Sequence, residues 1–466
     1  MLESALVQLN PREVVIPQSD IPLSKKLQQM LTKNRILVTH KPMSDFLAMS
    51  EADIKRVCNT KTNIVSLTEN CLASSVCTSL FKYLGIHSDP QGNLYNVELL
   101  NLTDYMRIDH RTVDGLNLFD YTGLVGSSIF QILNKTRTPG GTRLLQTWIK
   151  QPLIQLDMIR ERLDLVEQFV GNSDVRQSLY EDHLRKMPDF QRIATKFQNK
   201  KANLQDMYKV YVAITKLKGL RDQLDSFGEG AAALLVTENF TKDITEALRD
   251  FEKYLQLVET TMDLDQVRNG HFLIKSSFDE ELGELRNMID SVEGRIKNTL
   301  KSAGVEYGVE AGKVLKLEHS SSHGYYFRLT LKEEKAVRND KSITIIESNK
   351  TGIKFRNKKL LALNDEHSEL SEKYEKQQSA IVAEMLGIAS GYTDIMNHLG
   401  RIISKLDVIV SLSLVAVSAP NQYTKPEILP QTGRRMRFKG KSFFSPAHTM
   451  YTVNVSRYVS RKLLLK

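Results

Sequence analysis

The sequence predicts a mainly α-helical protein with a coiled-coil arm, a small antiparallel β-sheet at the tip of that arm, and an α/β unit at the start of the chain. Three patterns support this fold class. Helical periodicity dominates residues 116–264, two heptad-like helices flank a stretch with a period of two, and residues 1–108 mix both patterns. A chain of 466 residues is long enough for about three domains.

The α/β unit is predicted from alternating short patterns in residues 1–108. Strands are expected at Ala5 to Leu9, at Val14 to Pro17 and at Arg35 to Thr39, and a helix at Ala73 to Leu84. A further run of the same mixed character extends from Leu94 to Met106.

The helical part is interrupted at Pro139 to Gly141, Pro152, Pro188 and Gly228 to Gly230. One helix is expected to extend from Phe190 to Tyr208, with an apolar face and a basic stripe that we interpret as solvated. The apolar face consists of Phe190, Ile193, Phe197, Leu204 and Tyr208, and the stripe of Arg192, Lys196 and Lys200.

The arm is predicted from two matching helices. Ser277 followed by Glu280 forms a capping-box pattern at the start of the first helix. About 23 residues of helix would give an arm of roughly 35 Å. The apolar seam of the first helix is Phe278, Leu282, Leu285, Ile289, Val292, Ile296 and Leu300, and that of the returning helix is Leu363, Leu370, Tyr374, Ile381, Met385 and Ile388.

Four short strands are predicted between the two arm helices, because the period changes there from helical to two. They are Val314 to Leu317, Tyr325 to Leu331, Ile343 to Ile346 and Ile353 to Phe355. The turn residues at 322–324 and 349–352 indicate hairpin connections.

The tip is basic on an otherwise neutral chain. Residues 332–359 hold nine Lys and Arg against four Asp and Glu. The whole chain has 64 basic and 55 acidic residues, but residues 434–466 hold nine of the basic ones and no acid, so residues 1–433 balance at 55 against 55. Two interpretations follow: contact with the phosphate backbone of a nucleic acid, or protection of an edge strand against aggregation.

Composition narrows the remaining function classes. The three cysteines, Cys58, Cys71 and Cys77, show no metal-ligand spacing, which predicts a reducing intracellular compartment. The longest apolar run, Val408 to Val417, is too short to span a bilayer, and residues 1–12 show no secretory leader. The ten histidines form no HExxH motif and no nucleophile motif is visible, so an enzyme is not predicted.

A family resemblance adds to these predictions. Residues 133–145 (LNKTRTPGGTRLL), 148–153 (WIKQPL) and 160–166 (RERLDLV) resemble the core signature of MutS proteins, which recognise DNA mismatches. Residues 187–206, 259–278, 324–328 and 332–335 resemble the eukaryotic branch of that family that supplies the common subunit of nuclear mismatch-recognition heterodimers.

The resemblance implies a division into five segments. Residues 1–110 would be a partial connector domain, 111–265 the core and lever helices, 266–364 a DNA-binding clamp, and 365–430 the returning lever helices. Residues 431–466 look unlike the family and are predicted to be a disordered basic tail. The implied location is the nucleus, and the implied partners are duplex DNA with mismatches or insertion/deletion loops, a second MutS-homologue subunit and MutL-type proteins; no membrane contact is expected.

The chain also departs from the family pattern. MutS proteins are ATPases that bind ATP and magnesium through a GxxxxGK[ST] loop, which the 466 residues do not contain. Residues 439–442 match only its end, because Arg435 stands where the leading glycine belongs. We therefore predict no ATP, no magnesium, no other cofactor and no catalytic residue in this chain. Asp279 to Gly283 resembles an acidic metal motif and Phe227 to Glu229 a mismatch wedge, but both are interpreted as structural.

Two functional hypotheses result. The first is DNA backbone contact at the tip as part of a MutS-type mismatch-repair heterodimer. The second is an interaction fragment that binds MutS-type or downstream repair partners without repair activity of its own. The predicted DNA-binding residues are Lys335, Arg338, Asn339, Lys341, Lys350, Lys354, Arg356, Asn357, Lys358 and Lys359.

Overall fold

The chain folds into two compact units in the computed structural model. The first unit is made of residues 1–192, 215–248 and 395–466, and the second of residues 193–214 and 249–394. The predicted segment 111–265 contributes to both units, and the division into five segments stays a prediction. The structure describes residues 2–9, 11–18, 24–33, 36–48, 53–54, 57, 70–86, 102–120, 128–267, 272–320, 322–330, 333, 337, 343–349, 352–420 and 423–428.

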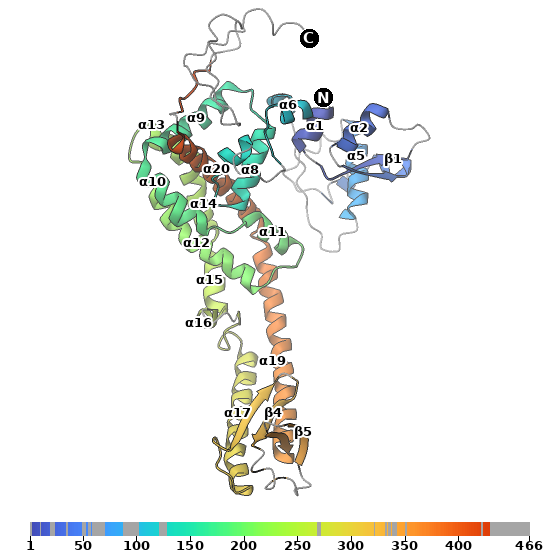
Figure 1. The fold of residues 1–466 in the computed structure, drawn as a ribbon, viewed down its shortest axis with the longest axis vertical. Coiled ribbons are helices and arrows are strands. Elements are labelled where there is room, and N and C mark those ends of the chain that lie inside the picture. Colours follow the sequence, from blue (N-terminus) through green and yellow to red (C-terminus); the bar gives the residue numbers. More distant parts are fainter. Residues whose placement is uncertain are drawn as a thin grey trace, which may run out of the picture. The chain divides into compact units, whose positions relative to one another are not determined.

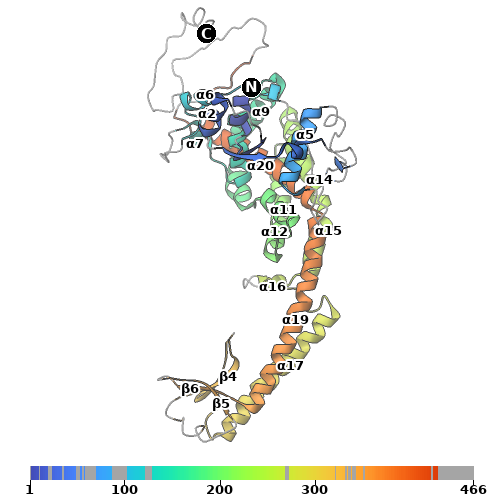
Figure 2. The same cartoon turned by 90° about the vertical axis from the view of Figure 1, so that its right-hand side faces the viewer.

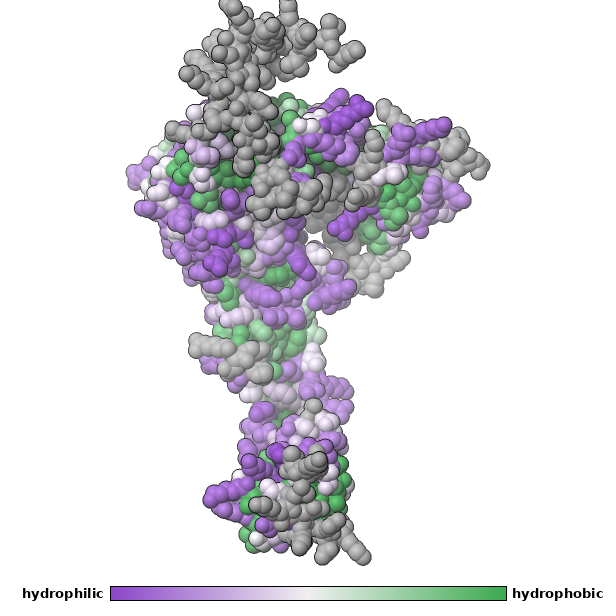
Figure 3. Space-filling model, in the orientation of Figure 1, coloured by the Kyte–Doolittle hydropathy of each residue, from purple (hydrophilic) through white to green (hydrophobic). Residues whose placement is uncertain are grey.

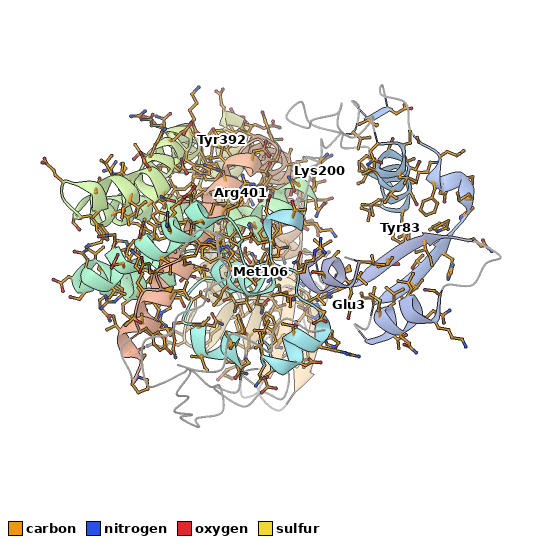
Figure 4. All side chains as sticks on the ribbon, turned by 90° about the horizontal axis from the view of Figure 1, so that it is seen from above. Glu3, Tyr83, Met106, Lys200, Tyr392 and Arg401 are labelled. Atoms are coloured by element: carbon orange, nitrogen blue, oxygen red, sulfur yellow. The ribbon has the colours of Figure 1, made fainter. Side chains whose placement is uncertain are left out.

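The first unit begins with the predicted α/β part. Two parallel strands pair Val14 with Val38, and helix α5 lies beside them (Figure 4). The Tyr83 hydroxyl of α5 donates a hydrogen bond of 2.6 Å to Glu13 on β1. The elements are α1 (Leu2–Leu9), β1 (Glu13–Pro17), α2 (Lys25–Lys33), β2 (Leu37–Lys41), the 3-10 helix η1 (Met43–Phe46), α5 (Cys71–Tyr83), the 3-10 helix η3 (Leu102–Asp104) and α6 (His110–Gly115).

Most of this part agrees with the sequence predictions, with one error. The strands at Val14 to Pro17 and Arg35 to Thr39 and the helix at Ala73 to Leu84 are confirmed within one to two residues, and Arg35 itself lies outside the described residues. The strand predicted at Ala5 to Leu9 is wrong, because these residues belong to α1. Leu2, Leu6 and Leu9 recur at helical spacing, but the segment from Ala5 to Leu9 contains only two of them, so the helical period was not visible in it. Of the run from Leu94 to Met106, residues 94–101 lie outside the described residues.

The rest of the first unit is helical, as predicted (Figure 1). Its elements are α7 (Ile129–Leu133), α8 (Pro139–Lys150), α9 (Leu156–Gly171), α10 (Ser173–Ser178), the π-helix η4 (Leu179–His183), the 3-10 helix η5 (Leu184–Lys186), α13 (Ala231–Val236) and the π-helix η6 (Thr237–Thr241). Parts of α11 (Phe190–Gln198), α12 (Leu204–Asp225), α14 (Lys242–Asp250) and α20 (Thr393–Ser418) also belong to it.

Helix α20 packs closely against the start of α8. Asp407 is fully buried on α20, and its carboxylate accepts hydrogen bonds from the backbone N–H groups of Arg137 and Thr138 at 2.9 and 2.7 Å. Thr138 caps α8 by accepting from Gly141 N–H at 2.9 Å. A Cβ at Gly141 would lie 2.3 Å from the Asp407 carboxylate, so this approach requires glycine. The interruption predicted at Pro139 to Gly141 is therefore the start of a helix.

The second unit contains two long helices and a four-stranded sheet. The strands follow the order β3-β4-β6-β5 and are antiparallel, which confirms both predicted hairpins. Figure 2 shows α17 and α19 side by side along most of α17. The elements are α15 (Glu252–Thr261), α16 (Leu264–Val267), α17 (Glu280–Glu306), β3 (Leu315–Ser320), β4 (Gly324–Leu329), β5 (Ile343–Asn349), β6 (Gly352–Asn357) and α19 (Lys358–Ser390).

The predicted seam between the arm helices is confirmed over most of its length. On α17 the buried seam residues are Leu282, Ile289, Val292 and Ile296. The start of α17 differs from the prediction, because Asp279 caps the helix by accepting from Leu282 N–H at 2.8 Å and Ser277 precedes the cap. With 27 residues α17 is about 40 Å long.

Two seam residues were predicted wrongly. Phe278 is 46% exposed because it precedes the helix, and Ile388 is 50% exposed because Ala389 takes the buried position at that end of α19. On α19 Leu363, Ile381 and Met385 are buried as predicted.

The single helix predicted from Phe190 to Tyr208 is two helices. Lys200 adopts a left-handed φ of 51° after α11, and the Asn203 side chain accepts from Asp206 N–H at 2.9 Å as α12 begins. Lys196 of the predicted solvated stripe pairs with Asp206 at 2.8 Å. The apolar face is still buried at Ile193, Phe197 and Leu204, so the core assignment is confirmed.

Three further predictions concern single features. Cys71 is exposed and Cys77 half-buried, and both are free thiols, whereas Cys58 lies outside the described residues. In the part of the chain that the structure describes, no helix is long and apolar enough to cross a bilayer, and the side chains form no metal-binding cluster of His, Cys, Asp or Glu.

Candidate nucleic-acid interface

The sheet of the second unit is held on the arm by one apolar face. Alternate residues of β4 and β6 point toward α17 and α19, and Phe327 and Phe355 are completely buried with their ring centres 5.6 Å apart. Burying each such side chain contributes about 1.5–3 kcal/mol. The cluster comprises Val292, Ile296, Ala303, Leu315, Phe327, Leu329, Val337, Ile353, Phe355, Leu360 and Leu363.

A glycine keeps two strands close at this point. Gly352 has a φ of 142°, and a Cβ there would lie 2.2 Å from the carbonyl oxygen of Leu329 on the neighbouring strand. A side chain would therefore push β6 away from β4. Gly352, one of the turn residues that predicted the hairpin, is therefore also required for the close packing of β6 against β4.

The other face of the sheet carries a row of charged residues. Strand register places Lys316 opposite Arg328, Arg328 opposite Lys354, and Lys354 opposite Glu347. Side chains at paired positions lie on the same face of a sheet. One line across the four strands therefore holds three cations and one acid, and we call this the cationic row.

Two members of the cationic row are already paired within the sheet. Arg328 lies 3.1 Å from Glu318, and Lys354 lies 2.7 Å from Glu347. The hydrogen bond between the last two raises the pKa of Lys354 and lowers the pKa of Glu347. The Lys354 ammonium also lies 5.6 Å from the ring centre of Tyr326. These cations are partly neutralised before any ligand arrives.

Four other cations have no acidic partner among the described residues. Lys316 is the exposed end of the cationic row, and Arg356 follows Lys354 on the same strand and face. Lys358 and Lys359 are exposed in the first turn of α19, which contains no acid. Positive charge at a helix N-terminus opposes the helix dipole by about 0.3–1 kcal/mol per residue. Local stability therefore does not explain this pair of lysines.

The structure places half of the predicted DNA-binding residues. Lys354, Arg356, Lys358 and Lys359 lie together at the end of β6 and the start of α19. Asn357 lies between them but is buried, and its side-chain oxygen accepts from Leu360 N–H at 2.8 Å to cap α19. Its position therefore supports a structural role. The other predicted residues, Lys335, Arg338, Asn339, Lys341 and Lys350, lie outside the described residues.

Sequence reasoning missed two residues of this face, Lys316 and Arg328. Both precede the segment whose charge was counted. Alternation along their strands would have predicted that they point away from the apolar face. Their alignment with Lys354 could not have been predicted, because it depends on strand order and register.

The acidic motif at Asp279 to Gly283 and the wedge-like motif at Phe227 to Glu229 both contribute contacts within the fold. Asp279 is the N-cap of α17 and accepts a hydrogen bond from Leu282 N–H. Phe227 packs edge-on against Phe169 with ring centres 5.1 Å apart, which holds it in the first unit. Lys439 to Ser442 and the basic tail lie outside the described residues.

Comparison with known proteins agrees with the resemblance noted in the sequence. The family model for MutS domain III matches residues 111–413, well over half of the chain. The chain belongs to the MutS family. This match covers both arm helices and the whole four-stranded sheet, so the cationic row lies within MutS domain III.

Relatives from several eukaryotes match nearly the whole chain. DNA mismatch repair protein msh-2 of Neurospora crassa is 32% identical over 93% of this chain and 47% of its own length. DNA mismatch repair protein MSH2 of Arabidopsis thaliana is 30% identical over 92% of this chain and 47% of its own length. The bacterial DNA mismatch repair protein MutS of Streptococcus thermophilus is 27% identical over 78% of this chain and 41% of its own length. The chain thus spans about half the length of the relatives it matches.

Proposed function

We propose that this chain is part of a MutS-type DNA mismatch-repair subunit and that the outer face of its sheet contacts the backbone of duplex DNA. The observation that carries the proposal is the group of cations at the sheet and the start of α19 for which the described part of the chain offers no acidic partner. Phosphate oxygens are the anions that Lys and Arg contact most often on DNA. The repair role rests on the names of the relatives and on family membership.

The proposed contact residues fall into two groups. Lys316, Arg356, Lys358 and Lys359 have no acidic partner among the described residues and are exposed or half-exposed, so we propose them as the primary contacts. Arg328 and Lys354 must first leave Glu318 and Glu347, and are secondary. Lys335, Arg338, Asn339, Lys341 and Lys350 stay proposed on sequence grounds alone.

Backbone contact carries no sequence information by itself. The sheet should therefore bind matched and mismatched duplexes equally well, and recognition of the mismatch would come from another part of the assembly. This also predicts a strong salt dependence, because bound counterions are released from the DNA.

The assembly that we propose follows the family. The chain would pair with a second MutS-homologue subunit, contact MutL-type proteins and act in the nucleus. We also propose that these 466 residues hydrolyse no ATP, which is supported by the absence of a GxxxxGK[ST] sequence from them. ATP-dependent switching would then require a nucleotide-binding domain outside them.

A second candidate function is that of an interaction fragment that binds repair proteins without contacting DNA. One observation favours it. Leu72, Val76 and Leu80 lie on α5 at a spacing of four residues and are 80%, 59% and 44% exposed. Such an exposed apolar stripe is typical of protein-binding surfaces.

Binding of the purified chain to a fluorescent duplex separates the two candidates. Replacing Lys316, Arg356, Lys358 and Lys359 by glutamine should weaken binding strongly and equally for matched and mismatched duplexes. The control carries the same charge change at the exposed Lys242, Lys253, Lys373 and Lys376, and should bind as before. Capture of a MutS-homologue partner by a chain that shows no DNA binding would favour the interaction fragment.

A further inference from the structure

A pocket in the first unit lies apart from the proposed DNA contacts. It has a volume of about 440 Å³, a size usual for ligand pockets, and is lined by α8, α9 and α20 together with Gln191 of α11. Each of α8, α9 and α20 contributes residues spaced three or four apart, such as Leu144 and Trp148 on α8 and Met158 and Arg162 on α9. Residues at these spacings share one helix face, so the pocket is formed by three facing sides.

The pocket walls combine apolar and cationic side chains. The Arg162 guanidinium lies over the Trp148 ring, with its central carbon 3.6 Å from the ring centre. Arg143, Arg401 and Lys405 also line the pocket. Trp, Met and Arg are the residue types enriched in the central parts of protein interfaces.

Two of the four cations are already paired. Arg143 binds Asp189 through two hydrogen bonds of 2.8 Å each. Lys405 lies 3.3 Å from Glu161, which itself lines the pocket. The charges of these two pairs cancel.

The other two cations, Arg162 and Arg401, have no hydrogen-bond acceptor in the part of the chain that the structure describes. Arg401 is exposed on α20. Arg162 is half-buried, and this burial lowers the pKa of its guanidinium. A guanidinium that loses water without gaining an acceptor is costly, so an anion that reached it would be bound favourably.

We infer that this pocket binds an acidic peptide segment of a partner protein, with an apolar side chain between Trp148 and Met158 and carboxylates on Arg162 and Arg401. The charge of the pocket favours this occupant, since Arg162 and Arg401, which have no acceptor within the described ranges, match two carboxylates. Met158 is 43% exposed, so its side chain is accessible to such an apolar group.

The chain contains a built-in probe for this pocket, because Trp148 is its only tryptophan. We would titrate the intact chain with acetyl-Asp-Leu-Asp-Leu-Asp-amide and follow the tryptophan fluorescence. The expected result is a saturable change that acetyl-Asn-Leu-Asn-Leu-Asn-amide does not produce.

Variants then assign the response to the pocket. Arg401→Gln is the main test, because this exposed residue can change without disturbing the fold, and it should weaken peptide binding about tenfold. Arg162→Gln should weaken it at least as much. Lys216→Gln is the control, since Lys216 is an exposed lysine of the same unit outside the pocket, and it should bind as the original chain does.

Three outcomes would overturn the inference. They are an equal response to the neutral peptide, an unchanged affinity in Arg401→Gln, and a response to inorganic phosphate with none to the acidic peptide. The pocket shares no residue with the proposed DNA contacts, so failure of one proposal leaves the other untouched.

Discussion

Replacing Lys358 and Lys359 by glutamine should have opposite effects on stability and on DNA binding. Both lysines occupy the first turn of α19, where they oppose the helix dipole and where Asn357 already supplies the cap. Glutamine has nearly the same helix propensity as lysine. Removing two charges should therefore raise the free energy of unfolding by about 0.6–2 kcal/mol, at 0.3–1 kcal/mol per residue.

The loss of DNA affinity can be worked out from counterion release. Each phosphate contact contributes a slope of about −0.9 in a plot of log K against log salt. Relative to 1 M salt, one contact at 0.15 M is then worth about 0.7 in log K, or about fivefold. Two contacts give roughly a 25-fold loss, and the salt slope should become about 1.8 less steep.

Urea unfolding and fluorescence anisotropy with a labelled 40-base-pair duplex measure the two quantities. The control is Lys373→Gln with Lys376→Gln, which makes the same charge change on exposed positions of the same helix. This control should leave DNA affinity unchanged within about twofold. The reasoning is refuted if the Lys358 and Lys359 variant is stabilised but binds DNA with unchanged affinity and slope.

Three further outcomes follow from named contacts. Asp279→Ala should lower the free energy of unfolding by about 1 kcal/mol in urea, whereas Ser277→Ala should not, because Asp279 holds the cap. Glu347→Gln should tighten DNA binding up to about fivefold by releasing Lys354 for phosphate. Asp189→Asn should reduce the loss of folding stability in acid. A hydrogen bond from Arg143 lowers the pKa of Asp189 from its ordinary value of 3.8, so the stabilisation by this carboxylate is full above that value and is lost as pH falls through the folded pKa.

Each of these has a result that would contradict it. If Ser277→Ala lowers the free energy of unfolding as much as Asp279→Ala does, Ser277 caps the helix as well and the assignment of the cap to Asp279 alone is wrong. Weaker DNA binding after Glu347→Gln would mean that the glutamate supports the binding face rather than competing with phosphate. If the pH dependence of the free energy of unfolding below pH 4 is unchanged in Asp189→Asn, the pair of Asp189 with Arg143 does not cause the loss of stability in acid.

The elements predicted well from sequence are those with a clear period. The apolar spacing from Leu282 to Ile296 is incompatible with a strand, and the alternation in Ile353 to Phe355 is incompatible with a helix, so both were identified correctly. Helix ends were harder. Ser277 and Asp279 are both good N-caps two residues apart, and only the geometry at Leu282 decides between them.

Long-range pairing could not be predicted from a single chain. Asp407 binds the backbone of Arg137 and Thr138, about 270 residues earlier, and nothing local to either segment indicates the other. The break between α11 and α12 at Lys200 contains no proline or glycine, so the local sequence does not indicate it. The cationic row depends on the same kind of information, since its residues come from different strands and meet only through their register.

The tip could be located from the sequence, but its individual contacts could not be predicted. Figure 3 shows mainly hydrophilic residues with small hydrophobic areas on the visible side of the sheet and arm helices. The excess of Lys and Arg over Asp and Glu in residues 332–359 identified the region from the sequence. It did not separate the cations paired with Glu318 and Glu347 from the unpaired ones.

The salt dependence of DNA binding by the intact chain tests the central claim most directly. With Lys316, Arg356, Lys358 and Lys359 each on a phosphate, the account predicts a slope of log K against log salt of about −3.6 or steeper, the same for matched and mismatched duplexes. A slope near zero, or no binding at 50 mM salt, would contradict the assignment of this face to the DNA backbone.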